Sequence, residues 1–280
     1  MHHTVIKSSV TESFYGLIQQ SRDVETGRKV LSEIAKHGLE TEPFLATHLI
    51  RMFSSFGSLL ESNQVFSKLL CPTAFAWSAI ISAHSELGHS HHARLLYNRM
   101  WTQEEFTPNE YVFVHSLRAC PIYATHVRLI HHHIVQTWID PKVIVTNTLI
   151  DVYTKCGGLS DAQDIFKRVK RRDIVAWNSM IAGYSQNNHS DEALKCFRKM
   201  KDVGLCPNSV TYICALKACG MTRSLGTGED IGAEVRKQGL LEKNVMLSSA
   251  LVDMYCKCGA LGKARELFDQ LPMQDVVSWN

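Results

Sequence analysis

Apolar side chains recur along most of this chain with the spacing of one face of a helix. In residues 174–208, one apolar run extends from Trp177 to Tyr184 and a second extends from Ala193 to Met200. Both runs have the i, i+3, i+4, i+7 spacing that is typical of an amphipathic helix. The pattern therefore predicts two helices in this stretch, each with one buried face.

Turn-forming residues separate the two predicted helices and end the pair. Between them lies the polar stretch 186–192, in which Ser190 is the expected N-cap of the second helix and Asp191 lies in its first turn. Gly204, followed shortly by Pro207, is a typical C-terminal stop signal. The stretch is thus a closed helix pair of about 35 residues.

The same helix-pair pattern returns along the chain. Residues 147–157 read Asn-Thr-Leu-Ile-Asp-Val-Tyr-Thr-Lys-Cys-Gly, and residues 249–259 read Ser-Ala-Leu-Val-Asp-Met-Tyr-Cys-Lys-Cys-Gly. A fainter copy occupies residues 47–57. A short unit of this kind cannot bury its apolar face alone, so neighbouring units must stack. The sequence therefore predicts an all-α fold, an α-solenoid of about eight antiparallel helix pairs with the first helices along a concave face.

Aligning the copies divides the chain into eight units of unequal length. A leader of residues 1–9 precedes the array, and residues 276–280 look like the cut-off start of a further unit. The expected units are 10–42, 43–73, 74–109, 110–142, 143–173, 174–208, 209–244 and 245–275.

Composition adds little beyond solubility. The 280 residues are 45% hydrophobic, and the net charge of +3 with a pI near 8.3 permits a polyanionic partner without requiring one. Nine scattered cysteines, without a secretory signal, are expected to be reduced thiols. The longest apolar runs hold about ten residues, whereas a membrane span needs roughly 20. We expect no membrane association.

No pattern in the chain indicates catalysis or a metal site. His131, His132 and His133 are adjacent on a helix and point in different directions, and no Cys-x-x-Cys spacing occurs. His84-Ser85-Glu86 matches the His-x-Glu of zinc deaminases, but no Pro-Cys-x-x-Cys follows it. There is no nucleophile elbow, phosphate loop or pair of carboxylates. We therefore expect neither an enzyme nor a metal, cofactor or small-molecule substrate.

The repeated motifs resemble one family of helical repeats. Residues 176–181 read Ala-Trp-Asn-Ser-Met-Ile and residues 76–81 read Ala-Trp-Ser-Ala-Ile-Ile, while Lys-Cys-Gly and Ala-Cys each occur twice. Tetratricopeptide repeats have Trp and Leu-Gly early in helix one, whereas the Trp of these units is followed by Asn or Ser and then by Ile. The motifs instead resemble the pentatricopeptide repeats of plant organelle proteins, whose fold is a right-handed superhelix similar to that of tetratricopeptide arrays.

The alternation of unit types is similar to the PLS subclass of that family. Units 10–42, 110–142 and 209–244 look like L repeats, and units 43–73, 143–173 and 245–275 look like S repeats. Units 74–109 and 174–208, with the start at 276–280, look like P repeats. We expect a member without the C-terminal E and DYW deaminase extensions that many members of the subclass carry.

This resemblance implies sequence-specific binding of single-stranded RNA, about one base per repeat. In the family, the fifth and last residues of a unit face the base edge, and the second residue packs on the base plane. The implied base-reading pairs are Ser78/Asn109, Asn147/Asp173, Asn178/Asn208 and Ser249/Asp275. The implied base-stacking residues are Phe75, Ile144, Val175 and Met246.

The four reading pairs imply a short RNA footprint. By the family's pairing habits, Ser/Asn favours A, Asn/Asp favours U, Asn/Asn favours C over U and Ser/Asp favours G, which gives A-x-U-(C/U)-x-G. An amide with one donor and one acceptor suits a pyrimidine, and a hydroxyl with a carboxylate suits guanine. Three units receive no base, because their pairs are Thr47/Thr73, Val114/Lys142 and Ile213/Asn244.

The family also implies a biological role, with two alternatives left open. The implied role is a non-catalytic specificity factor in organellar RNA processing or C-to-U editing, with editing-complex proteins supplying a deaminase in trans. The mitochondrion is the first expectation and the chloroplast the second, although no transit peptide is visible. The alternatives are a helical scaffold that binds peptides on its concave face and a non-functional fragment of a longer editing factor.

Overall fold

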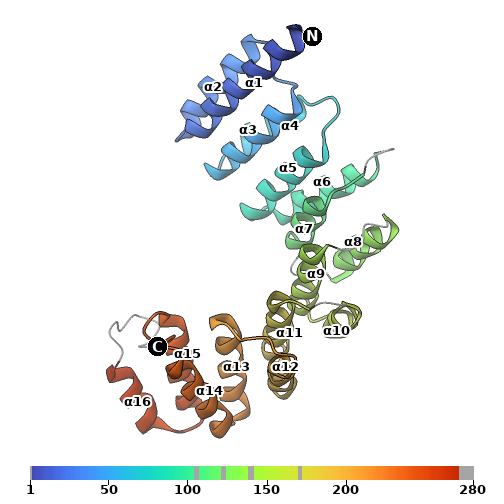
Figure 1. Ribbon diagram of the computed structural model, residues 1–280. Helices are drawn as coiled ribbons and strands as arrows, with labels where there is room; N and C mark the ends of the chain where they lie inside the picture. The colour runs from blue at the N-terminus through green and yellow to red at the C-terminus, as the bar shows by residue number, and fades with distance from the viewer. Residues whose placement is uncertain (1, 104–106, 121–123, 138–141, 170–171, 271–280) are drawn as a thin grey trace. The chain divides into compact units, whose positions relative to one another are not determined.

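The computed structural model describes residues 2–103, 107–120, 124–137, 142–169 and 172–270. In these residues the chain forms sixteen α-helices and no β-strand. The helices follow one another as eight consecutive pairs, so the predicted all-α solenoid class is confirmed (Figure 1).

The chain divides into two compact units, Met1–Thr148 and Leu149–Asn280, and the boundary falls inside helix α9. Up to this helix the elements are α1 (His2–Gln20), α2 (Val24–Lys36), α3 (Pro43–Ser55), α4 (Leu59–Ser67), α5 (Ala74–Glu86), α6 (Ser90–Trp101), α7 (Glu110–Arg118), α8 (Ala124–Gln136) and α9 (Val143–Lys155). They are followed by α10 (Leu159–Arg168), α11 (Ile174–Gln186), α12 (Ser190–Asp202), α13 (Ser209–Thr222), α14 (Leu225–Lys237), α15 (Val245–Lys257) and α16 (Leu261–Gln270).

Seven of the eight first helices begin at the first residue of an expected repeat. These residues are Pro43, Ala74, Glu110, Val143, Ile174, Ser209 and Val245. The first repeat differs, because α1 already begins at His2, whereas residues 1–9 were expected to be a leader outside the array. No Gly or Pro occurs between His2 and Tyr15, so nothing in the sequence stops the helix from extending towards the N-terminus.

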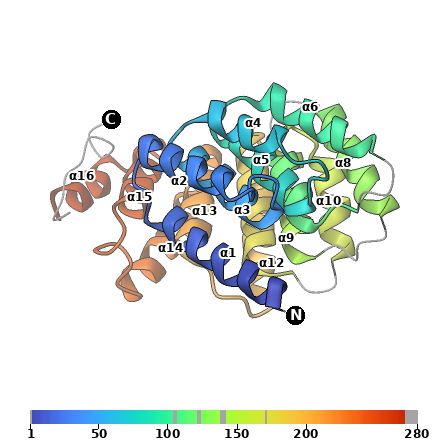
Figure 2. The same cartoon turned by 90° about the horizontal axis from the view of Figure 1, so that it is seen from above.

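Within each compact unit, the first helices of neighbouring pairs pack against one another. Helices α1, α3, α5 and α7 make consecutive contacts in the first unit, and α11, α13 and α15 do so in the second. The second helices pack against first helices on either side, as α4 does on α3 and α5 and α14 does on α13 and α15 (Figures 1 and 2). The first helices therefore form a layer that runs through each unit.

Aromatic contacts between a second helix and the next first helix fill the core. Phe66 meets Trp77 edge-on, with ring centroids 4.7 Å apart, and Phe166 meets Trp177 in the same way at 4.9 Å. Both tryptophans are buried. The same contact thus joins neighbouring pairs in both compact units.

Left-handed residues close the turn inside six of the pairs, namely α3–α4, α5–α6, α9–α10, α11–α12, α13–α14 and α15–α16. Gly157 has φ of 77°, and the next N–H, that of Gly158, donates to Tyr153 O at 2.8 Å. Asn188 takes the same place at φ of 63° in the following pair. Helix α12 then begins at Ser190 with His189 in the N-cap position, so the expectation that Ser190 is the N-cap was wrong. The left-handed turn ends one residue earlier than expected, and Ser190 is instead buried in the first turn.

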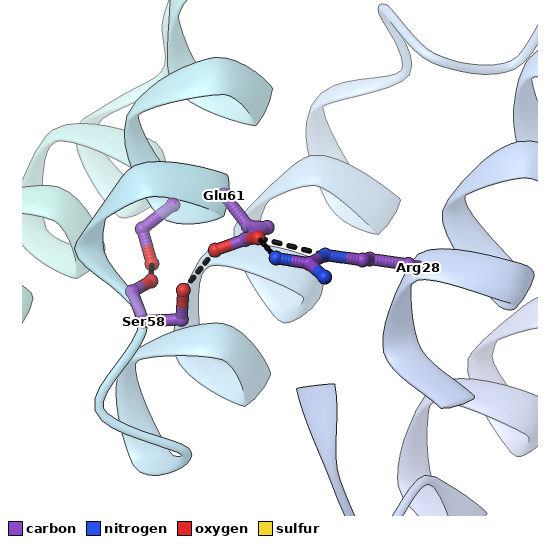
Figure 3. Close-up of polar contacts among 4 residues, drawn as sticks. Arg28, Ser58 and Glu61 are labelled. Carbon is purple, nitrogen blue, oxygen red and sulfur yellow. Dashed lines mark hydrogen bonds and ion pairs between the residues drawn. The ribbon is translucent and has the colours of Figure 1, made fainter. Parts of the chain in front are cut away.

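A buried carboxylate links two second helices of the N-terminal compact unit. Glu61 on α4 accepts from Arg28 Nε on α2 at 2.8 Å, and its other oxygen accepts from Ser58 Oγ (Figure 3). The Arg28 hydrogen bond holds the pKa of Glu61 below its usual value, although burial acts in the opposite direction. Both carboxylate oxygens have partners, which is the condition under which a charge is tolerated inside a protein.

Candidate nucleic-acid interface

The last residue of a repeat caps the first helix of the next one. The side-chain oxygen of Asn109 accepts from Val112 N at 3.0 Å, that of Asp173 from Ala176 N at 2.9 Å, and that of Asn208 from Thr211 N at 3.0 Å. Thr73 and Asn244 cap α5 and α15 in the same way. Capping satisfies a backbone donor that the helix leaves open and fixes each side chain at the end of a first helix.

The structure brings one predicted reading pair into direct contact. Asn178 Nδ2 on α11 donates to Asn208 Oδ1 at 3.2 Å, and Thr211 Oγ1 on α13 donates to Asn178 Oδ1 at 2.6 Å. Thr211 Oγ1 also lies 3.0 Å from Asn208 Oδ1. The fifth residue of one repeat and its last residue therefore share a hydrogen-bonded cluster that holds both amides in place.

The pair Ser78 and Asn109 is not joined in this way. Ser78 on α5 is 1% exposed. Neither Ser78 Oγ nor Asn109 Nδ2 has a hydrogen-bond partner within the described part of the chain. Such orphaned buried groups are uncommon in proteins and point to a ligand or water that completes them.

The other two predicted pairs are only partly described. Asn147 on α9 belongs to the first compact unit and Asp173 to the second, so that pair is divided between them. Ser249 lies on α15 and is 9% exposed. Asp275 lies outside the described residues, as do residues 276–280.

The second residue of a repeat is an exposed apolar side chain in seven repeats. The four predicted stacking residues are exposed to similar extents: Phe75 by 55%, Ile144 by 42%, Val175 by 51% and Met246 by 57%. Sequence reasoning missed three others at the same repeat position, namely Phe44, Tyr111 and Val210. The repeat register alone could have found them, since they were left out only because their units had no assigned base.

Aromatic rings gather around the second-position residues of the N-terminal unit. The ring centroids of Phe44 and His48 are 4.6 Å apart, and Tyr15 lies 5.4 Å from Phe44 and 4.6 Å from His48. Phe44, His48, Phe75 and Tyr111 line a cavity of about 680 Å³ between α3, α5 and α7. We call this cavity the aromatic hollow.

The repeats that received no base have reading positions already used within the fold. Thr47 Oγ1 donates to Pro43 O at 2.7 Å, and the Thr73 hydroxyl caps α5. Val114 is buried, and Lys142 pairs with Glu110 at 2.5 Å. Thr47, Thr73 and Lys142 have protein partners, whereas Ser78 Oγ and Asn109 Nδ2 have none among the described residues.

Three histidine rings lie close together at α5 and α6. The rings of His84 and His92 are stacked with centroids 5.7 Å apart, and His89 meets each of them edge-on at 6.1–6.2 Å. Burial, with His92 and His89 nearby, lowers the pKa of His84 to about 4. Among the described residues, no group of three or more His, Cys, Asp or Glu side chains could hold a metal ion. In the same part of the chain, no helix combines the length and apolar character that crossing a membrane requires.

Comparison with family models finds repeats along the chain. A model described as the PPR repeat family matches residues 172–221, and a model described as a PPR repeat matches residues 75–103, 144–174 and 248–276. PPR stands for pentatricopeptide repeat. The matches follow the register of the helix pairs α5–α6, α9–α10, α11–α12 and α15–α16.

Curated relatives with these repeats come from Arabidopsis thaliana. A chloroplastic pentatricopeptide repeat-containing protein is 33% identical over 93% of this chain and 42% of its own length. Another is 34% identical over 99% of this chain and 37% of its own length. A mitochondrial one is 32% identical over 93% of this chain and 40% of its own length. The chain thus spans about two fifths of these relatives.

Solved structures share the fold. The pentatricopeptide repeat protein PPR10 in complex with an 18-nucleotide psaJ RNA element superimposes with a TM-score of 0.77, covering 95% of this chain and 41% of that one, at 19% identity. PPR10 from maize superimposes with a TM-score of 0.71 over 94% of this chain and 40% of that one, at 21% identity.

Proposed function

The chain belongs to the pentatricopeptide repeat family, and from this premise we propose that it binds single-stranded RNA along its layer of first helices, with about one base per repeat. The observation that carries the proposal is the exposed apolar residue at the second position of seven repeats. Isolated apolar residues on a surface need no explanation, but a set that recurs at one repeat position does. Flat nucleobases are ligands that such side chains can cover.

Polar groups beside this apolar row supply the contacts for base edges. In the cluster of Asn178, Asn208 and Thr211, each amide has a donor and an acceptor side, and the hydrogen bonds between them hold both amides in place. We assign C or U to this pair and A to Ser78 with Asn109. With U at Asn147/Asp173 and G at Ser249/Asp275, the proposed footprint is A-x-U-(C/U)-x-G, from 5′ to 3′.

We further propose that the protein is a PLS-type specificity factor rather than an enzyme. The order of 31-residue and longer units supports this subclass. A protein that recognises only four bases would act by positioning a partner protein on a transcript. The partner would be a deaminase supplied in trans in C-to-U editing, or another enzyme in RNA processing. The relatives' mitochondrial and chloroplastic names support an organelle, and we favour the mitochondrion.

A fluorescence-anisotropy titration at fixed salt tests the proposal. One RNA holds A-x-U-C-x-G in a U-poor single strand, and a second has the four specified bases permuted. We expect at least a tenfold preference for the first RNA. Equal affinity for both would refute base reading, and no binding of either RNA would refute RNA binding and favour the peptide-scaffold alternative.

The variant Asn178→Ala tests the assigned pair. Removing one amide should lower affinity for the matched RNA by one to two decades, on the order of 1–3 kcal/mol. The control is Asn98→Ala, because Asn98 is an exposed asparagine on the second helix α6. An unchanged affinity of Asn178→Ala, with the control also unchanged, would contradict the pairing.

A further inference from the structure

The three 31-residue repeats differ in charge at the ninth position of their first helix. In the repeats that begin at residues 143 and 245, this position is an aspartate paired with a lysine four residues later. Asp151 lies 2.7 Å from Lys155, and Asp253 lies 2.7 Å from Lys257. The repeat that begins at residue 43 has Arg51 at this position and Ser55 in place of the lysine.

Arg51 is therefore a cation without a counterion where the sister repeats are neutral. Its side chain is exposed, and it makes no hydrogen bond or ion pair with any residue that the structure describes. Arginine is always protonated and offers five donors in a planar fork. The guanidinium of Arg51 is thus charged, and no acceptor of the described residues forms a hydrogen bond with it.

Arg51 lies where two cavities meet. It lines the aromatic hollow, and it also lines a second cavity of about 270 Å³ together with Ser54, Ser78 and His115. We call the second cavity the serine hollow. Ser78 is 1% exposed, and its Oγ has no hydrogen-bond partner among the described residues. A buried hydroxyl without a partner beside an unpaired guanidinium indicates a site that an acceptor would complete.

The lining of the serine hollow holds the donors Arg51, Ser78 and His115 and one carboxylate, that of Glu86. Burial lowers the pKa of His115, and Arg118 adds to this, so at neutral pH His115 is a neutral ring that can donate one N–H. The acidic residue in the lining, Glu86, accepts a hydrogen bond from Ser82 at 2.5 Å. A ligand that accepts hydrogen bonds and carries negative charge fits Arg51 and His115, and a phosphate diester is such a ligand, while the Ser78 hydroxyl remains available to the base assigned to Ser78 and Asn109.

We propose that Arg51 binds a backbone phosphate of single-stranded RNA while the adjoining base stacks in the aromatic hollow, whatever that base is. This inference rests on the proposed function. It gives a role to the repeat at 43–73, which has no assigned reading pair but whose Phe44, His48 and Arg51 line the aromatic hollow. The repeat anchors the strand and does not read its sequence.

The test compares Arg51→Gln with Lys217→Gln in anisotropy titrations of the full chain over a range of salt concentrations. Lys217 is the exposed cation at the same ninth position of the repeat at 209–244, so the two variants remove the same charge. Each lost phosphate contact flattens the slope of log affinity against log salt by about 0.7 for a single strand.

For Arg51→Gln we expect about tenfold weaker binding at low salt, a slope flatter by about 0.7 and an unchanged ratio between matched and permuted RNA. Lys217→Gln should stay within about twofold of the parent protein, because Lys217 lines neither the aromatic hollow nor the serine hollow. A parent-like slope for Arg51→Gln, or a changed base preference, would overturn the anchoring role while leaving RNA binding in place. If the parent chain binds neither RNA, the proposed function itself fails, and the anchoring role fails with it.

Discussion

Residues 74–109 and 174–208 are two copies of one repeat type, one in each compact unit, and they share a core but not a surface. Trp77 and Trp177 are both buried against a phenylalanine of the preceding pair. Behind them, His84 bonds Asn63 at 3.0 Å, and Tyr184 bonds Gln163 at 2.7 Å. Different side chains thus make the same contact between helices, which shows that geometry constrains this position more than chemistry does.

The exposed faces of the two copies differ where ligand contacts are proposed. The N-terminal copy presents Phe75 and a buried, unpaired Ser78, whereas the C-terminal copy presents Val175 and the hydrogen-bonded Asn178. The N-terminal unit therefore offers aromatic area and few polar groups, and the C-terminal unit offers less apolar area and an ordered amide pair. A common core allows the face that we propose to bind RNA to change without changing the fold.

The largest expected effect is on stability, and it comes from the buried tryptophan that both copies share. Trp77→Ala and Trp177→Ala should each lower the free energy of unfolding by about 3–5 kcal/mol, since each removes a buried aromatic side chain. Urea denaturation followed by circular dichroism measures both. Asn98→Ala, on the surface of α6, should change it by less than about 0.5 kcal/mol. A loss at only one of the two tryptophans would show that the cores are not equivalent.

A difference in close packing predicts the next effect. A Cβ on Gly183 would lie 2.4 Å from the Thr154 side chain, whereas Ala83 at the corresponding position lies beside the smaller Ser54. Overpacking against Thr154 should cost about 3 kcal/mol, and the higher helix propensity of Ala should offset about 1 kcal/mol of this cost. We therefore expect Gly183→Ala to lower the free energy of unfolding by about 2 kcal/mol. Adding Thr154→Ser should recover part of this loss in the same denaturation experiment, and no recovery would place the strain elsewhere.

Exchanging a reading residue tests the difference between the two faces. Asn178→Ser gives the C-terminal copy the Ser/Asn pair of the N-terminal copy, so its preferred base should change from a pyrimidine to A. We expect the ratio of affinities for RNAs with A and C at that base to change by about tenfold, or 1.4 kcal/mol. Competition titrations with the two RNAs measure the ratio, and an unchanged ratio would separate this position from base reading.

The smallest expected effect concerns His84 and Tyr184. Because the pKa of His84 is about 4 in the folded chain and about 6.5 when unfolded, its neutral form is favoured by folding. Its contribution to stability is complete above pH 6.5 and is lost as the pH falls towards 4. Between pH 7 and 6 the loss should be a few tenths of a kcal/mol.

The variant His84→Tyr isolates this pH effect. Other histidines with lowered pKa values, such as His115, act in the same direction and remain in the variant. The difference between parent and variant in thermal midpoints at pH 7 and pH 6 therefore reports His84 alone. Parallel pH dependence of the two proteins would contradict the lowered pKa.

The apolar pattern alone was sufficient to predict the helix pairs and most of their starting residues. Pro43, Ala74 and Ile174 begin first helices as expected, because a unit this short has one way to bury its apolar face. The sequence was less informative at Ser190, where a good cap residue lies inside the helix, since the left-handed Asn188 and not cap preference decides where the turn ends.

The sequence by itself determined the fold class, the repeat register and the residue types at each reading position. Only the tertiary structure decided what those residues contact. It bonds Asn178 to Asn208 both directly and through Thr211, it places Arg51 in the lining of two hollows, and it leaves Ser78 Oγ buried without a partner among the described residues. Helix periodicity is local and can be recognised in a short stretch of sequence, whereas hydrogen-bond partners and cavities depend on which helices pack together.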